Sequence, residues 1–482
     1  MITEGKMFDV AVIGGGVIGG TILRELAKYQ LEVCLLEKAD DVCMGQSKAN
    51  SGIVHAGFDA AEGTLKAKFN VEGNKMMPTL CKDLGVKYKN NGSLVVAFSD
   101  EDVKTLYALK ERGEKNGVTD MEIIGRDELR ALEKNISDNA VGALWAKTGG
   151  IVCPYELTIA SIGNAMDNGA KLFTNFGVVG GEKTQDGYII RSADGKEVAA
   201  KYVIICAGLG SEQVANGFGD DSLKTGGRKG EYILLDRESG DFVSHTLFFT
   251  PTAKGKGILV SQTVDNNIIL GPTAEDIANG STATSAEGLA AVISKANEMC
   301  KNVPIYNSIT SFTGVRSYCD RHDFIIEESR KAENVFLCAG IESPGLTSSP
   351  AIAKYVVEEL IGRKVALTRK PNFNGKRKAD CFFKNLTNEE KNEIIRKDPT
   401  YGNIVCRCEQ ITEGEIVRAV RENPPAKNID AVKRRTRAGM GRCQGGFCQP
   451  HVAEIIAREL NIGFEEVTKN GKNSELVTGR CK

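Results

Sequence analysis

Apolar and polar positions at the start of the chain follow two different periods. Phe8–Ile13 is an apolar run of strand length, and a glycine-rich turn follows it. Val17–Tyr29 then repeats its apolar residues at helical spacing, and Glu32–Glu37 forms a second short apolar run. A change of period from strand to helix and back to strand predicts one βαβ unit.

The same mixture of periods continues to about residue 370. Val335–Ala339 is another apolar strand, and Ser349–Ile361 after it repeats at helical spacing. Further strand and helix patterns lie between these regions, at Tyr188–Arg191, Val203–Cys206, Tyr232–Leu235, Ile268–Leu270, Asp100–Lys115 and Ala286–Cys300. Interleaved strands and helices predict an α/β (α+β) fold, in which a Rossmann-like nucleotide-binding layer carries an inserted mixed sheet for the substrate.

The composition of the chain changes after Lys370. Residues 371–384 are polar and basic, and residues 385–399 are mostly charged. We therefore interpret 371–400 as a linker between a large module, 1–370, and a small C-terminal domain with its tail, 401–482. Within the large module we assign 7–90, 150–225 and 325–370 to the nucleotide-binding part, and 91–149 and 226–324 to the substrate-binding part.

The overall charge is balanced, with 62 Lys and Arg against 63 Asp and Glu. A net charge of −1 provides no field that would attract nucleic acid or an anionic membrane. Apolar runs stay below the roughly 18 residues of a membrane span, and the first residues lack the pattern of a signal peptide. We therefore expect a cytoplasmic protein without nucleic-acid partners, which could reach a membrane only through a partner.

A glycine motif lies between the first predicted strand and the first predicted helix. Gly14, Gly16 and Gly19 have the spacing G-x-G-x-x-G, which allows a tight turn, close approach to a pyrophosphate and close helix packing. Glu37 ends the second strand, where a carboxylate accepts the hydroxyls of an unphosphorylated ribose. This pattern predicts FAD or NAD. Gly208 and Gly340 end two later strands, and contacts spread so widely along the chain favour FAD, the longer cofactor.

Seven longer blocks carry a family resemblance, namely Ala49–Gly57, Leu65–Asn70, Pro251–Gly257, Gly271–Ala274, Gly314–Arg316, Ser343–Thr347 and Pro371–Lys376. These blocks resemble the glycine/D-amino-acid oxidase superfamily of flavoproteins. Within it they are most similar to soluble glycerol-3-phosphate oxidases and dehydrogenases, and next to L-2-hydroxyglutarate oxidases. The resemblance covers about Met7 to Lys376. It implies FAD-dependent oxidation of sn-glycerol 3-phosphate, a small phosphorylated polyol, to dihydroxyacetone phosphate.

The candidate reacting residues come from this chemistry together with the resemblance. Oxidation of an alcohol needs a base for the hydroxyl proton, and a neutral histidine suits this role. The resemblance implies that His55 is the base, with His245 and His322 as alternatives. It also implies that Arg316 binds the anionic group of the substrate. The other residues that we assign to the substrate or the cofactor are Lys256, Ser51, Ser343, Ser47, Gly345, Leu346 and Thr347.

Four of the 14 cysteines form a tight group, Cys406, Cys408, Cys443 and Cys448. Four thiolates can bind zinc or an iron–sulfur cluster, and the C-x-C and C-x4-C spacings are poor for structural zinc. The run Tyr401–Leu460 resembles the [2Fe-2S] domain of bacterioferritin-associated ferredoxin, which implies a [2Fe-2S] cluster, with zinc as the alternative. We expect the basic run Lys433–Arg437 to offset the charge of the cluster or to form a docking face for an acidic partner.

The added domain bears on where the electrons go. The oxidases that this chain resembles consist of the flavoprotein module alone and pass electrons to oxygen. Here we expect a relay through the cluster to a redox partner, such as a second flavoprotein or a quinone- or NAD-linked acceptor. Alternative enzymes are an L-2-hydroxyglutarate-type 2-hydroxyacid dehydrogenase and a small-amine or imino-acid dehydrogenase. An electron-transfer or redox-sensing subunit without its own substrate is a further alternative, against which His55, Arg316 and Lys256 argue.

Overall fold

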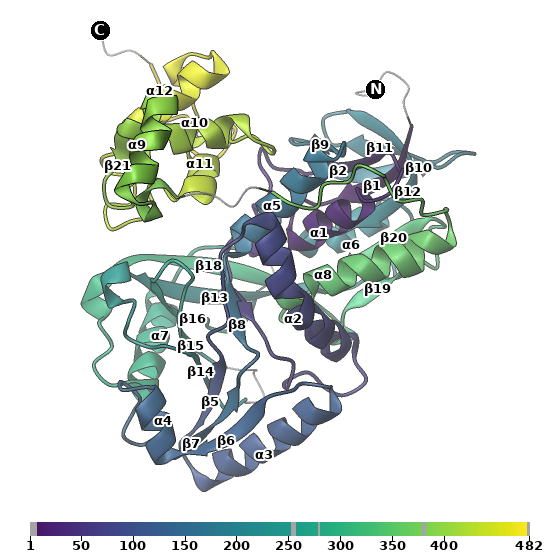
Figure 1. Ribbon diagram of the computed structural model, residues 1–482. Helices are drawn as coiled ribbons and strands as arrows, with labels where there is room; N and C mark the ends of the chain where they lie inside the picture. Colours follow the sequence, from purple (N-terminus) through teal and green to yellow (C-terminus); the bar gives the residue numbers. More distant parts are fainter. Residues whose placement is uncertain (1–6, 252–256, 278–279, 378–381, 480–482) are drawn as a thin grey trace.

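The computed structural model describes residues 7–251, 257–277, 280–377 and 382–479 (Figure 1). Its first large sheet, the nucleotide sheet, has the order β10-β11-β12-β1-β2-β9, with β20 beside β12 and β19 beside β20. Its strands are β1 (Met7–Ile13), β2 (Val33–Leu36), β9 (Lys171–Phe173), β10 (Val178–Lys183), β11 (Tyr188–Ser192), β12 (Glu197–Ile205), β19 (Ile325–Glu328) and β20 (Val335–Ala339). Strands β9, β2, β1, β12 and β20 pair in parallel.

Helices cover both faces of the nucleotide sheet, which explains why its parallel strands β1, β2 and β20 are almost continuously apolar. Val10 and Val12 of β1 face one core, and Ala11 and Ile13 face the other, because successive side chains of a strand point to opposite sides. The helices of the first core are α1 (Val17–Leu26), α2 (Leu65–Leu84), α5 (Pro154–Asp167) and α8 (Gly345–Tyr355); α6 (Ser211–Asn216) lies in the second. The predicted βαβ unit is confirmed as β1-α1-β2.

The second large sheet, the mixed sheet, has the order β17-β13-β16-β15-β14-β5-β7-β6, with β18 beside β13. Strands β14 and β5 pair in parallel and the other pairs are antiparallel. Its strands are β5 (Ser93–Ala97), β6 (Met121–Gly125), β7 (Gly142–Ala146), β13 (Thr225–Leu235), β14 (Thr246–Phe249), β15 (Leu259–Gln262), β16 (Ile268–Gly271), β17 (Glu275–Ile277) and β18 (Ser308–Cys319). Its helices are α3 (Asp100–Lys115), α4 (Arg126–Leu132) and α7 (Ala286–Met299). The expected α/β fold with an inserted mixed sheet is therefore confirmed.

A small sheet joins the two large ones. It has the order β3-β8-β4, with β3 (Ile53–Val54), β8 (Gly150–Val152) and β4 (Tyr88–Lys89). The chain passes from the nucleotide sheet to the mixed sheet through β3 and β4 and returns through β8, and it crosses directly between β12 and β13 and between β18 and β19. The exact residues that divide the large module into two parts stay a prediction.

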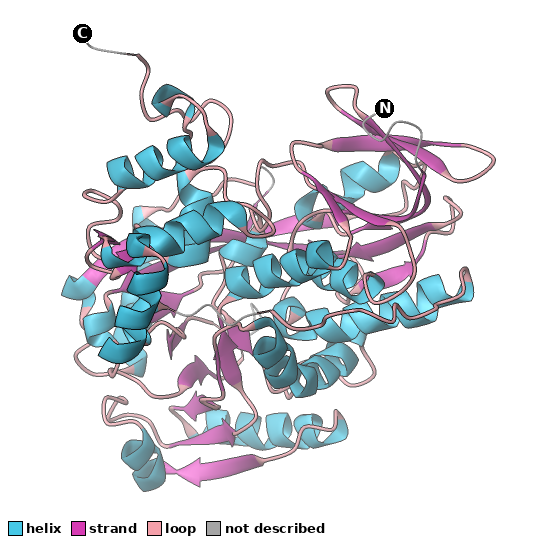
Figure 2. Cartoon of the chain, turned by 45° about the horizontal axis from the view of Figure 1, so that its top comes forward, coloured by secondary structure: helices cyan, strands magenta, loops and turns pink. Residues whose placement is uncertain are grey.

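The C-terminal domain is mostly helical (Figure 2). It contains β21 (Ile404–Cys406), β22 (Ile411–Thr412), α10 (Glu413–Arg421), α11 (Ile429–Thr436) and α12 (Gln449–Leu460). The segment interpreted as a linker is partly folded, since it includes α9 (Asn388–Lys397), which begins with a capping box between Thr387 and Glu390. Phe382 is buried in the core of the C-terminal domain, which anchors the end of this segment there.

Among the described residues, no helix is both long enough and apolar enough to cross a membrane.

Candidate active site and cluster site

A cavity of about 1070 Å³ lies between the nucleotide sheet and the mixed sheet. Ile13 and Leu36, at the carboxyl ends of β1 and β2, line one side of it, and Phe248 and Leu259 of the mixed sheet line the other. The carboxyl edge of a parallel sheet is the usual place for a nucleotide in such folds. The volume exceeds that of most drug-sized sites, as an extended dinucleotide together with a substrate requires.

The glycine turn after β1 could not accommodate side chains. A Cβ atom on Gly14 would lie 2.4 Å from the carbonyl oxygen of Cys206, and Gly14 has a φ of +109°. A Cβ atom on Gly19 would lie 2.0 Å from the carbonyl oxygen of Gly14, so Gly19 lets α1 pack against the turn. Gly16 is the N-cap of α1, and the N–H of Val17 donates to Ser47 Oγ at 2.9 Å. Gly15, Gly16, Val17 and Ile18 line the cavity, so the N-terminus of α1 is placed to receive an anionic group there.

Glu37 is held by the same turn. Its carboxylate accepts hydrogen bonds from the N–H of Gly15 at 2.6 Å and from the N–H of Ala39 at 2.8 Å. Burial raises the pKa of Glu37, although these two backbone donors act in the opposite direction. The carboxylate keeps further lone pairs for ribose hydroxyls at the edge of the cavity.

His55 and Ser343 meet in the cavity, with His55 Nε2 and Ser343 Oγ 3.2 Å apart. The backbone N–H of His55 donates to Thr347 Oγ1 at 2.9 Å. The side-chain amides of Asn70 and Asn74 both donate to the His55 carbonyl oxygen. The backbone of His55 is thus fixed from both sides, which orients its imidazole ring toward Ser343.

Arg316 provides positive charge on the mixed-sheet side of the cavity. Its Nη2 donates to the carbonyl oxygen of Thr273 at 3.0 Å, while its buried Nε has no hydrogen-bond partner among the residues that the structure describes. An unpartnered buried donor costs free energy unless a ligand supplies the acceptor. Tyr232 lies beside it: burial raises the pKa of Tyr232, while the charge of Arg316 and a hydrogen bond with Ser51 lower it. Arg316, Tyr232 and Ser51 therefore form one polar group on an otherwise largely apolar wall.

Most of the residues expected at the site line this cavity, namely Gly14, Gly16, Glu37, Ser47, Ser51, His55, Gly208, Arg316, Ser343, Gly345 and Leu346. Gly19, Gly340 and Thr347 do not line it; Gly19 packs against Gly14, Gly340 packs against Cys319, and Thr347 supports His55. Lys256 lies outside the described residues. The alternative bases are also away from the cavity lining, since His245 binds Glu133 and His322 is in a turn after β18.

Sequence reasoning missed three contributions to the cavity. Tyr232 was predicted only as part of a strand, and Phe248, 5.9 Å from the His55 ring between centroids, had no distinguishing pattern. Gln46 links two distant walls, because its amide donates to the carbonyl oxygen of Ile341 and accepts from the N–H of Ser317. The only sequence signal for Gln46 is that it is a polar residue directly before Ser47.

The four predicted ligand cysteines converge in the C-terminal domain. The Sγ atoms of Cys406 and Cys408 lie 3.8 Å apart, and those of Cys408 and Cys443 lie 3.9 Å apart. Cys448 is the N-cap of α12 and forms a hydrogen bond with Cys406. Burial raises the pKa of Cys443, but backbone N–H groups of Phe447 and Gly445 outweigh it and the net shift is downward. Four converging sulfurs with backbone donors fit an iron–sulfur cluster.

One expectation for this domain is wrong, namely that the run Lys433–Arg437 forms a docking face for an external partner. The alternative, that the run offsets the charge of the cluster, stays a prediction. Arg434, Arg435 and Arg437 instead form ion pairs with carboxylates of the large module, and their side chains are 5 to 7% exposed. Whether a charged run lies on an outer surface depends on tertiary packing, which its local pattern does not record.

The comparisons with known proteins agree with both sites. Residues 9–359 match the family model of FAD dependent oxidoreductases, and residues 404–458 match that of the BFD-like [2Fe-2S] binding domain. The chain is 47% identical over 478 residues to a glycerol 3-phosphate dehydrogenase of Caloramator mitchellensis, covering 99% of both chains. It is 32% identical to a glycerol 3-phosphate oxidase of Mycoplasma genitalium, covering 77% of this chain and 99% of that one.

A solved structure supports the same assignment. The L-alpha-glycerophosphate oxidase of Mycoplasma pneumoniae, with FAD bound, superposes with a TM-score of 0.74 at 30% identity. The superposition covers 77% of this chain and 98% of that one. The cavity and the glycine turn thus lie in a domain whose relatives bind FAD, and the four thiolates lie in a domain whose family binds a [2Fe-2S] cluster. The chain belongs to the FAD-dependent oxidoreductase family, with a BFD-like domain for a [2Fe-2S] cluster at its C-terminal end.

Proposed function

We propose that this protein oxidises sn-glycerol 3-phosphate to dihydroxyacetone phosphate and relays the electrons through its [2Fe-2S] cluster to a separate acceptor. The observation that carries the proposal is the buried Nε of Arg316, which lacks a hydrogen-bond partner within the described part of the chain and lies in the same cavity as the His55–Ser343 pair. Full-length similarity to a glycerol 3-phosphate dehydrogenase supports the same substrate.

The proposed role of Arg316 is to bind the phosphate of the substrate. A guanidinium held by Thr273 cannot turn away, so its Nε and remaining N–H groups present a fixed pair of donors. The neighbouring Ser51 and Tyr232 hydroxyls complete a polar wall on this side. A neutral polyol carries no negative charge to pair with Arg316, so this wall favours a phosphorylated polyol as the substrate.

The proposed role of His55 is to take the proton of the substrate hydroxyl at C2. When Nε2 accepts a hydrogen bond from Ser343, the ring proton is on Nδ1 and Nε2 is the basic atom. Thr347, Asn70 and Asn74 hold the backbone of His55 and limit its motion. FAD, when bound, supplies the acceptor for the hydride, and the cluster supplies a one-electron acceptor.

For the protein that accepts electrons from the cluster, we propose a chemical class. A second flavoprotein, or a quinone- or NAD-linked protein, would take single electrons from the cluster. A cytoplasmic location, with membrane attachment only through such a partner, stays a prediction.

The test is flavin bleaching after anaerobic mixing of the holoenzyme with candidate substrates. Glycerol 3-phosphate should bleach the flavin far faster than glycerol, L-2-hydroxyglutarate, proline or sarcosine. Faster bleaching by L-2-hydroxyglutarate or by an amine would replace the proposed substrate. Bleaching by none of them, with FAD and cluster both present, would instead support a subunit without its own substrate.

A further inference from the structure

We propose that the iron–sulfur domain does not swing, but is held in one position on the large module by a buried arginine latch. The arginine latch consists of Arg434, Arg435 and Arg437 of the C-terminal domain with Asp41 and Asp265 of the large module. Its function is to keep the cluster loop, residues 438–446, against the wall of the flavin cavity throughout turnover. This inference concerns domain arrangement and does not depend on which substrate is oxidised.

Asp41 forms the first half of the latch. Arg435 binds it with two parallel hydrogen bonds, Nη1 to Oδ2 at 2.9 Å and Nη2 to Oδ1 at 2.8 Å. Arg434 Nη2 binds the same carboxylate. Burial raises the pKa of Asp41, but the two arginines outweigh burial and lower it from 3.8 to about 2. The carboxylate is therefore charged and satisfied while the domain is docked.

The position of Asp41 connects the latch to the cofactor turn. Asp41 is near the start of the segment that runs from Glu37 to Ser47, and both of those residues line the cavity. The N–H of Cys43 in this segment donates to the carbonyl oxygen of Gly15 at 2.8 Å. One short segment thus touches the glycine turn on one side and the iron–sulfur domain on the other.

Arg437 forms the second half of the latch. Its Nη1 donates to Asp265 Oδ2 at 2.7 Å, and its Nη2 donates to Asn267 Oδ1 at 3.1 Å, both in the turn between β15 and β16. Its Nε donates to Glu409 Oε2 at 2.9 Å, and Glu409 follows the ligand Cys408. Arg437 has a φ of +73°, which non-glycine residues rarely adopt. Because one side chain binds all three residues, Arg437 ties Glu409, next to the ligand Cys408, directly to the turn between β15 and β16.

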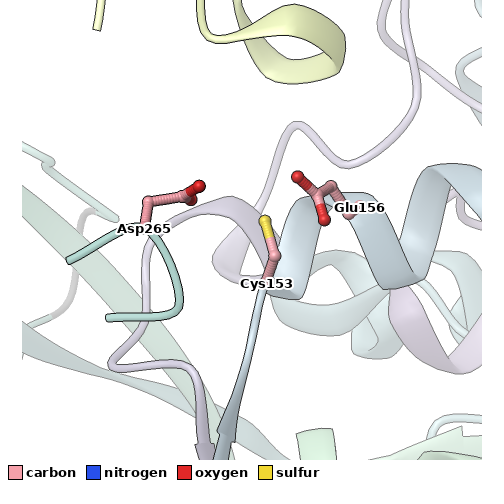
Figure 3. A group of neighbouring side chains, drawn as sticks. All are labelled: Cys153, Glu156 and Asp265. Carbon is pink, nitrogen blue, oxygen red and sulfur yellow. The ribbon is translucent and has the colours of Figure 1, made fainter. Parts of the chain in front are cut away.

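A group of polar side chains surrounds the second half of the latch. Figure 3 shows Cys153, Glu156 and Asp265 converging, from the end of β8, from α5 and from the β15–β16 turn. The ammonium of Lys87 binds Glu156 at 2.7 Å and also binds Asp265. Lys87 thus supplies the positive charge that a metal ion would bring, so the group acts as an ion-pair junction. Removal of Asp265 would take one of two carboxylate partners from Lys87 and from Arg437, which weakens the compensation of their buried charge.

The latch holds a chain of contacts between the cavity wall and the cluster ligands. Gly52 lines the cavity, and its carbonyl oxygen accepts from the N–H of Val152 at 2.8 Å. Tyr155, three positions later, directs its hydroxyl at Met440 Sδ, 3.6 Å away. Gly441 then packs on Cys408, since a Cβ atom on Gly441 would lie 2.5 Å from Cys408 Sγ. Electron transfer weakens steeply with distance, so a fixed contact here keeps the two centres coupled.

The test is hydrogen exchange on the full-length holoenzyme, at the cluster loop 438–446 and at the start of α5. Asp41→Asn and Asp265→Asn should each speed exchange at both of these faces by roughly tenfold or more. Asp41→Asn leaves Arg434 and Arg435 without their shared carboxylate. Asp265→Asn takes one of two carboxylate partners from Arg437 and from Lys87. The matched control is Glu238→Gln, which removes an exposed ion pair between the same two modules, with Arg442, and should leave exchange unchanged. Asp41→Glu, which restores the carboxylate, should recover most of the protection.

Two further readouts separate a positioning role from a general loss of folding. The cluster spectrum of Asp265→Asn should match the wild type, and its substrate-driven flavin bleaching should keep its rate while cluster reduction slows. In the wild type, protection at both faces should persist in high salt, which screens exposed ion pairs but not buried ones. Two results would overturn the latch. The first is a wild type in which both faces exchange as fast as exposed surface does. The second is that neither Asp41→Asn nor Asp265→Asn changes the exchange rate at these faces or the rate of cluster reduction.

Discussion

His55 Nε2 lies 3.2 Å from the hydroxyl oxygen of Ser343, although 288 positions of sequence separate the two residues. The pair brings the segment after β3 against the turn that precedes α8. Each residue also lines the cavity between the two large sheets. The proposed mechanism depends on this pair, because the serine fixes which imidazole nitrogen faces a substrate.

Replacement of His55 tests the proposed base. His55→Ala should slow flavin bleaching by glycerol 3-phosphate on the order of 100-fold or more, the usual contribution of a general base. FAD content should stay unchanged, because the glycine turn and Glu37 are not touched. Ser343→Ala should give a smaller loss, since it removes orientation and not the base. A His55→Ala enzyme as fast as the wild type would exclude the base role.

Replacement of Arg316 tests phosphate recognition. Arg316→Met should lower kcat/KM for glycerol 3-phosphate on the order of 30-fold or more, because a buried charge-assisted contact is lost. The same change should hardly affect the slow reaction with glycerol, which has no phosphate. Arg321→Met, which removes an arginine paired with Glu327 near the surface, is the matched control. Equal losses with both substrates would show that Arg316 supports the fold and not the phosphate.

Replacement of one thiolate tests the cluster assignment. Cys443→Ser should remove iron and sulfide while FAD remains bound, since the two sites lie in different domains. Cys300→Ala, which changes a buried cysteine of the large module, should leave the iron content at two per chain. Metal and sulfide analysis of anaerobically purified protein makes the measurement. Stoichiometric zinc without iron in the wild type would contradict the assignment.

Acidification tests the charge state of the latch. The pKa of Asp41 is lowered from 3.8 to about 2, so its contribution to docking is complete above about pH 4 and is lost as the pH falls toward 2. This linkage amounts to about 2 kcal/mol. The radius of gyration of the holoenzyme, measured by small-angle scattering, should therefore be the same at about pH 8 and about pH 5. Expansion already at pH 5 would show that another group controls docking.

Patterns among residues that are close in sequence predict much of the fold and much of both cofactor sites. The spacing of Gly14, Gly16 and Gly19 is set by contacts within one turn, so it is visible in sequence and was found again in the structure. Helix Asp100–Lys115 has the predicted bounds, because an N-cap serine and helical periodicity define it locally. The Cys406–Cys408 and Cys443–Cys448 pairs are likewise close in sequence.

Contacts between distant segments could not be predicted in this way. Asp41 and Arg434 are 393 positions apart, and neither lies in a sequence pattern that identifies the other as its partner. The same arginines looked like an exposed basic face, since burial of a charge is decided only when two modules pack together. Phe382 was taken as part of a linker for a similar reason, because its apolar contacts lie in the C-terminal core.

Anaerobic rapid mixing of the holoenzyme with glycerol 3-phosphate tests the central claim most directly. Flavin absorbance should bleach first, and the absorbance of the [2Fe-2S] cluster should fall afterwards at a rate independent of protein concentration, since both centres belong to one chain. In a variant with Cys406 and Cys408 replaced by serine, the flavin should still bleach, and reduction of an artificial acceptor should drop below that of the wild type. If glycerol 3-phosphate left the flavin oxidised, the proposed substrate would be wrong. If the variant reduced the acceptor and made peroxide as fast as the wild type, the cluster would not lie on the electron path.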